Sequence, residues 1–129
     1  MTSLRLETED SLVGMRHEVR RLARAQGFSL VQETKVVTAA SEIARNALDH
    51  AGGGVAHIEP IEEGGQSGVR VIIEDDGPGI ADVEEAFRDG YSTGTGFGFG
   101  LGGARRLSDE FELDSKPGRG TRVSMIRWK

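Results

Sequence analysis

The first half of the chain carries apolar residues at the three- and four-residue spacing of helices. A short alternating stretch over residues 3–9 predicts a strand, and the periodic run after it predicts a helix capped by Asp10 or Ser11. Gly27 is expected to end this helix, because glycine readily adopts the left-handed backbone of a helix terminus. The periodic positions are Leu12, Met15, Val19 and Leu22.

A second, longer helix is predicted to run from Ser29 to about Ala51. Ser29 and Gln32 have the spacing of a capping box, and three consecutive glycines at 52–54 stop the helical pattern. The apolar stripe of this helix consists of Val36, Ala40, Ile43, Ala44 and Ala47.

The second half of the chain alternates between strand-like runs and glycine-rich turns. The predicted strands are 55–61, 69–75, 110–115 and 121–128, and the predicted helices are 82–88 and 101–109. This order predicts an α+β fold: a two-layer sandwich with helices on one face of a mixed, mostly antiparallel sheet. All 129 residues are expected to form a single domain.

Composition narrows the possible partners. The formal net charge of −5 disfavours nucleic acid or an anionic membrane as the main partner, since both bind best to a basic surface. There is no cysteine, and the three histidines are too scattered to form a zinc motif. The start of the chain lacks a secretion-signal pattern and no apolar run reaches membrane-spanning length, so we expect a cytoplasmic protein.

Glu42, Arg45, Asn46 and Asp49 form a polar stripe on the second helix, opposite its apolar stripe. In one interpretation it is a solvated face, on which Arg45 pairs with Glu42 and Asp49. In the other, Glu42 supplies a carboxylate base and Asn46 a neutral oxygen ligand. Mg²⁺ accepts such oxygens while it keeps waters and substrate phosphates.

The run EDDGPGI, residues 74–80, follows the most strand-like segment. Its composition is typical of a surface turn. Alternatively, Asp75 accepts a hydrogen bond from an exocyclic amine such as that of a purine, while Gly77 and Gly79 let a flat ring lie against the chain.

The run GTGFGFGLGG, residues 94–103, is either a disordered loop or a backbone that approaches an anion closely. Its amides and the predicted helix after it favour a phosphate. Residues 98–103 match G-x-G-x-x-G, but no strand immediately precedes them and no acidic residue follows at about 20 positions, which disfavours a dinucleotide site. Residues 117–121 (PGRGT) are compatible with a plain hairpin turn.

Taken in order, SEIARNALDHA (41–51), EDDGPGI, GTGFGFGLGG and PGRGT resemble the N, G1, G2 and G3 boxes of the GHKL ATPase superfamily. The resemblance covers essentially the whole chain. The closer resemblance is to small bacterial serine/threonine kinases of the anti-sigma and partner-switching group, in particular the RsbT-type switch kinases. The segments that carry it are SEIARN, DDGPGI, GYST and GLGGARRLSDEF. This resemblance implies a Bergerat-type ATP-binding fold.

The resemblance also implies ATP and Mg²⁺ as cofactors. Glu42 would be the general base for the acceptor hydroxyl, Asn46 the Mg²⁺ ligand, and Asp75 the acceptor for the adenine amine. Further nucleotide-binding residues implied by it are Gly77, Gly79, Gly96, Gly98, Gly100, Leu101, Arg105 and Thr121, with Gly96, Gly98 and Gly100 in a lid over the phosphates.

One departure concerns the lid, in which related kinases often carry a basic residue. Here no Lys or Arg lies between Asp89 and Arg105. The negative charge of the γ-phosphate would then be neutralised by Mg²⁺, by backbone amides, or by Arg105 and Arg106.

The resemblance implies a protein substrate as well: a serine or threonine of a small STAS-domain antagonist, with a phosphatase or a sigma factor as the alternative partner. The competing hypothesis is a nucleotide-gated binding module that sequesters or activates such a partner with little phosphotransfer.

Overall fold

The computed structural model describes residues 1–80 and 100–129. The helix predicted over 82–88 and the lid glycines Gly96 and Gly98 lie outside the described residues.

Two helices, α1 (Glu9–Ala25) and α2 (Leu30–Ala51), follow the short strand β1 (Thr2–Leu6). The predicted cap of α1 was wrong by two or three positions. Thr8 has the extended backbone of an N-cap and accepts the Ser11 amide, while Ser11 sits at the third helical position and completes the capping box. Helix α2 starts with the predicted capping box and ends at the predicted residue.

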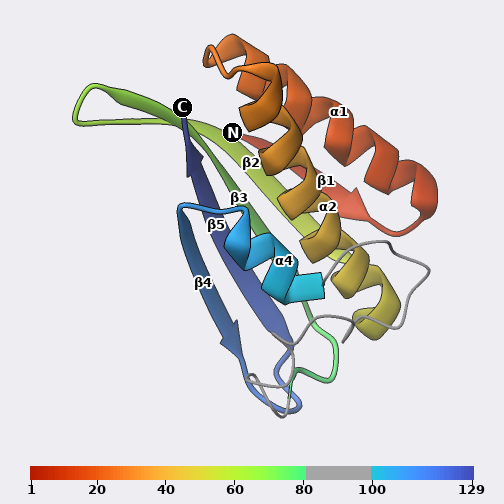
Figure 1. Ribbon diagram of the computed structural model, residues 1–129. Helices are drawn as coiled ribbons and strands as arrows, with labels where there is room; N and C mark the ends of the chain where they lie inside the picture. The colour runs from red at the N-terminus through yellow and green to blue at the C-terminus, as the bar shows by residue number, and fades with distance from the viewer. Residues whose placement is uncertain (81–99) are drawn as a thin grey trace.

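Five strands form one sheet in the order β1-β2-β3-β5-β4. The other four strands are β2 (Gly54–Glu63), β3 (Gln66–Asp75), β4 (Glu110–Ser115) and β5 (Thr121–Trp128). All four pairings among the described residues are antiparallel, so the expected mixed sheet is corrected to an antiparallel one. The helices α1 and α2 run antiparallel to each other, so the chain re-enters the sheet at the end where β1 left it (Figure 1). Strand β2 therefore runs antiparallel to β1.

The hairpin between β2 and β3 is tighter than predicted. Its strands continue to the glycine pair Gly64–Gly65, whose φ angles of +59° and +80° suit a two-residue turn that matches the strand twist. Helix α4 (Gly100–Arg106) is shorter than the predicted 101–109, because the Asp109 amide already bonds to the Ile126 carbonyl of β5 at 2.8 Å.

The helices cover one face of the sheet (Figure 1). α1 and α2 lie side by side, and α4 lies beside α2. The core between the layers includes Leu12, Val36, Ile43, Val71 and Met125, each at most 2% exposed. Among the helices of the described segments, none is both long and apolar enough to cross a membrane.

Candidate functional site

Glu42 and Asn46 lie one turn apart on α2, where that helix meets α4. The Glu42 carboxylate is half-buried and accepts the backbone N–H of Gly100, the first residue of α4. Burial raises the pKa of Glu42 above the ordinary 4.5, although the Gly100 bond and the charges of Arg45 and Arg16 oppose the shift. Asn46 is only 6% exposed, and within residues 1–80 and 100–129 its Oδ1 has no hydrogen-bond partner.

Arg45 does not form the ion pairs that the solvated-face interpretation predicted. Its guanidinium bonds both carboxylate oxygens of Glu9 in the first turn of α1, with Nη2 2.9 Å from Oε2. Glu42 and Asp49 act on Arg45 only as nearby charges. Packing of α1 against α2 therefore removes Arg45 as a hydrogen-bonding partner of Glu42.

Asp75 ends β3, as predicted, and its carboxylate is held by backbone donors. Gly77 N–H donates to its Oδ1 at 2.9 Å, and the Thr121 N–H donates to it as well. Burial raises the pKa of Asp75 above the ordinary 3.8, and these two bonds oppose the shift. Such a partly buried carboxylate is a directed acceptor for a ligand N–H.

The glycines around Asp75 are required by close backbone contacts. A Cβ on Gly77 would lie 2.4 Å from the Cβ of Ala51, and a Cβ on Gly79 would lie 2.1 Å from the carbonyl oxygen of Lys116. Gly79 also has a φ of +77°. These glycines hold the 77–80 loop between the end of α2 and the β4–β5 turn, a reason that the sequence did not reveal.

Ser115 is a site-adjacent residue that the sequence reasoning missed. Strand register places Asp75, Thr121 and Ser115 directly opposite one another on β3, β5 and β4. The Ser115 hydroxyl lies 2.8 Å from Thr121 Oγ1 and accepts the Ile80 N–H at 2.7 Å. Its place opposite Thr121 across the predicted PGRGT turn was the available signal.

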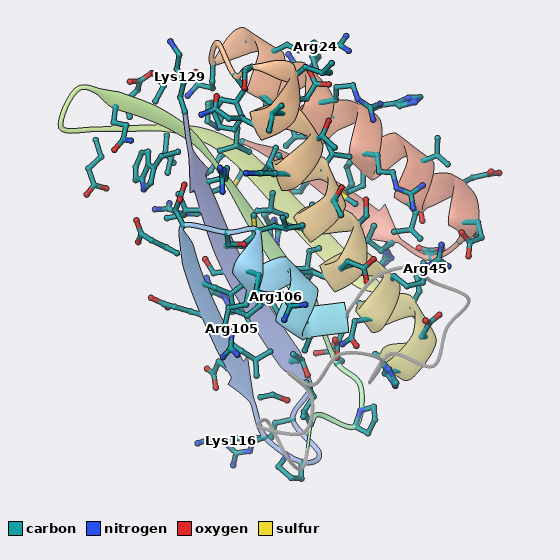
Figure 2. All side chains as sticks on the ribbon, viewed as in Figure 1. Arg24, Arg45, Arg105, Arg106, Lys116 and Lys129 are labelled. Carbon is teal, nitrogen blue, oxygen red and sulfur yellow. The ribbon has the colours of Figure 1, made fainter. Side chains whose placement is uncertain are left out.

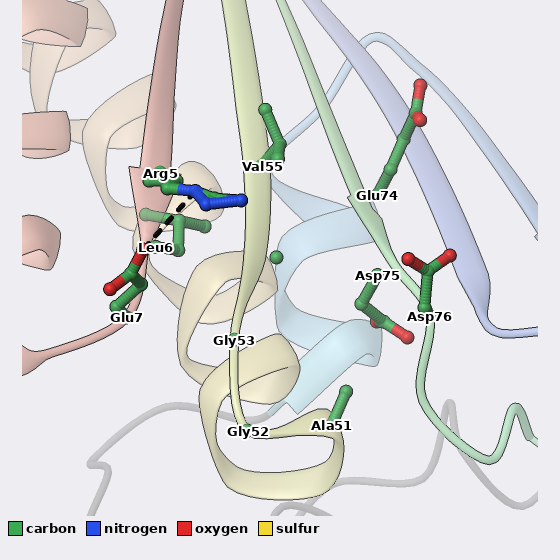
Figure 3. A pocket seen from close by; sticks show the side chains of 11 residues that line it. Arg5, Leu6, Glu7, Ala51, Gly52, Gly53, Val55, Glu74, Asp75 and Asp76 are labelled. Carbon is green, nitrogen blue, oxygen red and sulfur yellow. Dashed lines mark ion pairs between the residues drawn. The ribbon is translucent and has the colours of Figure 1, made fainter.

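Two open cavities flank Asp75. One, of about 360 Å³, lies between the ends of β1, β2 and β3 and the C-terminus of α2, with Asp75 and Asp76 across from Ala51 and Gly52 (Figure 3). The other, of about 330 Å³, is lined by Asp75, Ser115 and Thr121 among others. Neither of these two cavities is lined by Glu42 or Asn46.

Residues 31–129 match the family described as Histidine kinase-, DNA gyrase B-, and HSP90-like ATPase. The chain belongs to this ATPase family. It is also 42% identical to the Serine/threonine-protein kinase RsbT of Bacillus subtilis over 97% of this chain and 94% of that protein. The Anti-sigma F factor of Anoxybacillus flavithermus is 33% identical over 77% of this chain and 71% of its own length.

A solved structure supports the same fold. The RsbU and RsbW domains of a Mycobacterium tuberculosis protein match all of this chain and 33% of that one, with a TM-score of 0.63 and 19% identity. The predicted family and its two-layer fold are thus confirmed, and membership of this ATPase family implies that the chain binds ATP.

The remaining predicted nucleotide-binding residues in the described part of the chain are Gly100, Leu101 and Arg105, and all three lie on α4. Gly100 begins the helix with a φ of +65°, and the Leu101 side chain is fully buried in the core, so only its backbone is available to a nucleotide. Arg105 is exposed in the last turn of α4 (Figure 2). At 1.5 Å rise per residue, its Cα lies roughly 7.5 Å along the helix axis from that of Gly100.

Proposed function

We propose that this chain is an ATP-dependent protein serine/threonine kinase of a partner-switching module, acting on a serine or threonine of a STAS-domain protein. The observation that carries this proposal is Glu42. It is a half-buried carboxylate to which no arginine of residues 1–80 and 100–129 is bonded, one turn from Asn46, in a chain similar to RsbT over nearly its whole length. A cytoplasmic location of this chain stays a prediction.

In this proposal Glu42 is the general base. Its carboxylate takes the proton of the acceptor hydroxyl as that oxygen attacks the γ-phosphorus, and ADP leaves with the electrons of the broken P–O bond. The raised pKa of Glu42 makes it a stronger base than an exposed glutamate. Positioning and charge neutralisation supply most of the remaining catalysis in phosphoryl transfer.

Asp75, Gly77, Gly79 and Thr121 are proposed to bind the adenine, and the backbone from Gly100 the phosphates. Asn46 is proposed to hold Mg²⁺, because its buried Oδ1 lacks a partner in the described segments and neutral oxygens suit that ion. Mg²⁺ would neutralise phosphate charge when bound. The predicted contributions of Gly96, Gly98 and Arg105 stay predictions.

The test is transfer of radiolabelled γ-phosphate from Mg-ATP to candidate STAS-domain proteins. Glu42→Gln should abolish labelling of serine or threonine while ATP affinity stays within about twofold of wild type. Glu63→Gln, at the exposed tip of the β2–β3 hairpin, is the matched control and should label normally. Undiminished labelling by Glu42→Gln would remove Glu42 from the mechanism.

The anti-sigma F factor relatives favour a second candidate, a nucleotide-gated binding module. It predicts that Mg-ATP or Mg-ADP changes the affinity for a regulatory partner even in Glu42→Gln. Equal affinity with and without nucleotide would exclude it.

A further inference from the structure

Ser115 connects three parts of the proposed adenine subsite. It is the last residue of β4 and the cross-strand partner of Thr121, which in turn pairs with Asp75. Because directly paired residues of neighbouring strands point to the same side, these three side chains form one row on the helix-covered face. The row lies at the end of the sheet where the 77–80 loop begins.

The hydrogen bonds of Ser115 restrict the orientation of the Thr121 hydroxyl. Ser115 Oγ accepts the Ile80 N–H at 2.7 Å and lies 3.1 Å from the Gly120 carbonyl and 2.8 Å from Thr121 Oγ1. A hydroxyl has a single proton, and a carbonyl can only accept. When Ser115 donates to Gly120, Thr121 must donate its own proton to Ser115.

In that arrangement the Thr121 hydroxyl offers only lone pairs to a ligand. The neighbouring Asp75 carboxylate is also an acceptor, held by the N–H groups of Gly77 and Thr121. Two adjacent acceptors suit the exocyclic amine of adenine. They repel the carbonyl oxygen that guanine and hypoxanthine carry at the same ring position.

We propose that Ser115 is a positioning residue for the base of ATP: its hydroxyl orients Thr121 as an acceptor and holds the 77–80 loop through the Ile80 amide. This inference rests on the proposed ATP site. It adds a residue from outside the four motif segments and assigns it a part in selecting adenine over 6-oxopurines.

The experiment measures the Kd of the full chain for Mg-ATP and for Mg-inosine triphosphate, which carries a carbonyl oxygen in place of the adenine amine. Ser115→Ala should weaken ATP binding roughly tenfold and inosine triphosphate binding much less, so the preference for ATP falls. Ser115→Thr, which keeps the hydroxyl, should retain the preference. The control is Ser124→Ala, on the opposite face of the same hairpin.

A double-mutant cycle separates this role from a merely structural one. Ser115→Ala should change the ATP preference in the wild-type chain but not in Thr121→Val, because the oriented hydroxyl is then already absent. If Ser115→Ala does not fold, Ser115→Cys keeps the volume with a weak hydrogen-bonding sulfur and is measured in the same way.

An equal loss for both nucleotides, or the same change in both backgrounds, would overturn the role of Ser115 while the ATP site stands. Failure of the wild-type chain to bind ATP would overturn the ATP site itself, and this inference with it.

Discussion

Arg45 of α2 is bonded to Glu9 of α1 and not to Glu42, although Glu42 lies one turn away on its own helix. Both guanidinium–carboxylate contacts are made, and Nη2 lies 2.9 Å from Oε2. Glu42 instead accepts the backbone N–H of Gly100. The α1–α2 contact thus holds Arg45 away from a direct bond to the proposed base.

Glu9→Gln should lower phosphotransfer by roughly two- to fivefold, because the released Arg45 can pair with Glu42 at i−3 and weaken it as a base. ATP affinity should not change. Glu18→Gln is the matched control, since it removes a carboxylate partner of Arg21 on the same helix, away from the polar stripe. Steady-state kinetics at saturating ATP distinguish the two, and an equal effect of both variants would contradict the prediction.

The phosphotransfer rate should fall on the acid side at a pH above 4.5. Only ionised Glu42 can take a proton, and burial raises its pKa above that ordinary value. The measurement is kcat against pH with ATP saturating, so that protonation of Asp75, whose pKa is also raised, affects binding and not the measured rate. An acid limb centred at or below pH 4.5 would contradict a buried base.

Glu42→Gln should be at least as stable as wild type at pH 7. A carboxyl with a raised folded-state pKa binds its proton more tightly in the folded protein, so its contribution to stability is lost as pH rises from 4.5 through the folded pKa. A neutral glutamine avoids this loss. Melting temperatures from pH 4 to pH 8 should show the variant's advantage growing with pH, and a variant less stable at pH 7 would refute the cause assigned here.

Gly120→Ala should be far more damaging than Gly118→Ala. Both glycines have nearly the same φ, +78° and +79°, but a Cβ on Gly120 would lie 2.0 Å from the Asp75 carbonyl while Gly118 faces open space. Left-handed strain alone costs roughly 1–2 kcal/mol, which is the effect expected at Gly118.

The additional clash at Gly120 should weaken ATP binding, because it displaces the backbone of Asp75. Denaturant unfolding and ATP titration of both variants check this prediction. Equal losses would show that φ strain, and not the close approach of β3 and β5, is what requires glycine.

Asn46→Ala should reduce the dependence of ATP affinity on Mg²⁺ with little change in melting temperature. Asn46 is only 6% exposed, yet its Oδ1 has no hydrogen-bond partner among the described residues. Removing the side chain therefore breaks no observed hydrogen bond of Oδ1. Asn46→Asp keeps an oxygen at the position and should retain Mg²⁺ dependence. Titration of ATP with and without Mg²⁺ tests this, and an unchanged Mg²⁺ effect in Asn46→Ala would assign the ion elsewhere.

Sequence reasoning was accurate where structure depends on near neighbours. The capping box at Ser29 and Gln32 and the strands at 110–115 and 121–128 were predicted at their observed boundaries. It was wrong at the start of α1, where Thr8 and not Asp10 or Ser11 caps the helix. Thr8, Asp10 and Ser11 are all residue types that favour the N-cap position, so residue type alone could not decide which of them caps the helix.

Residue type and spacing within a few turns were enough to predict the approximate positions of the described helices and strands, the family motifs, and the placement of Glu42 and Asn46 on one stripe of α2. Three contacts are visible only in the folded chain: Arg45 pairs with Glu9, Gly77 lies against Ala51, and Ser115 lies beside Thr121. These contacts depend on how α1 packs on α2 and on strand register, where a shift of one residue would turn every side chain to the other face.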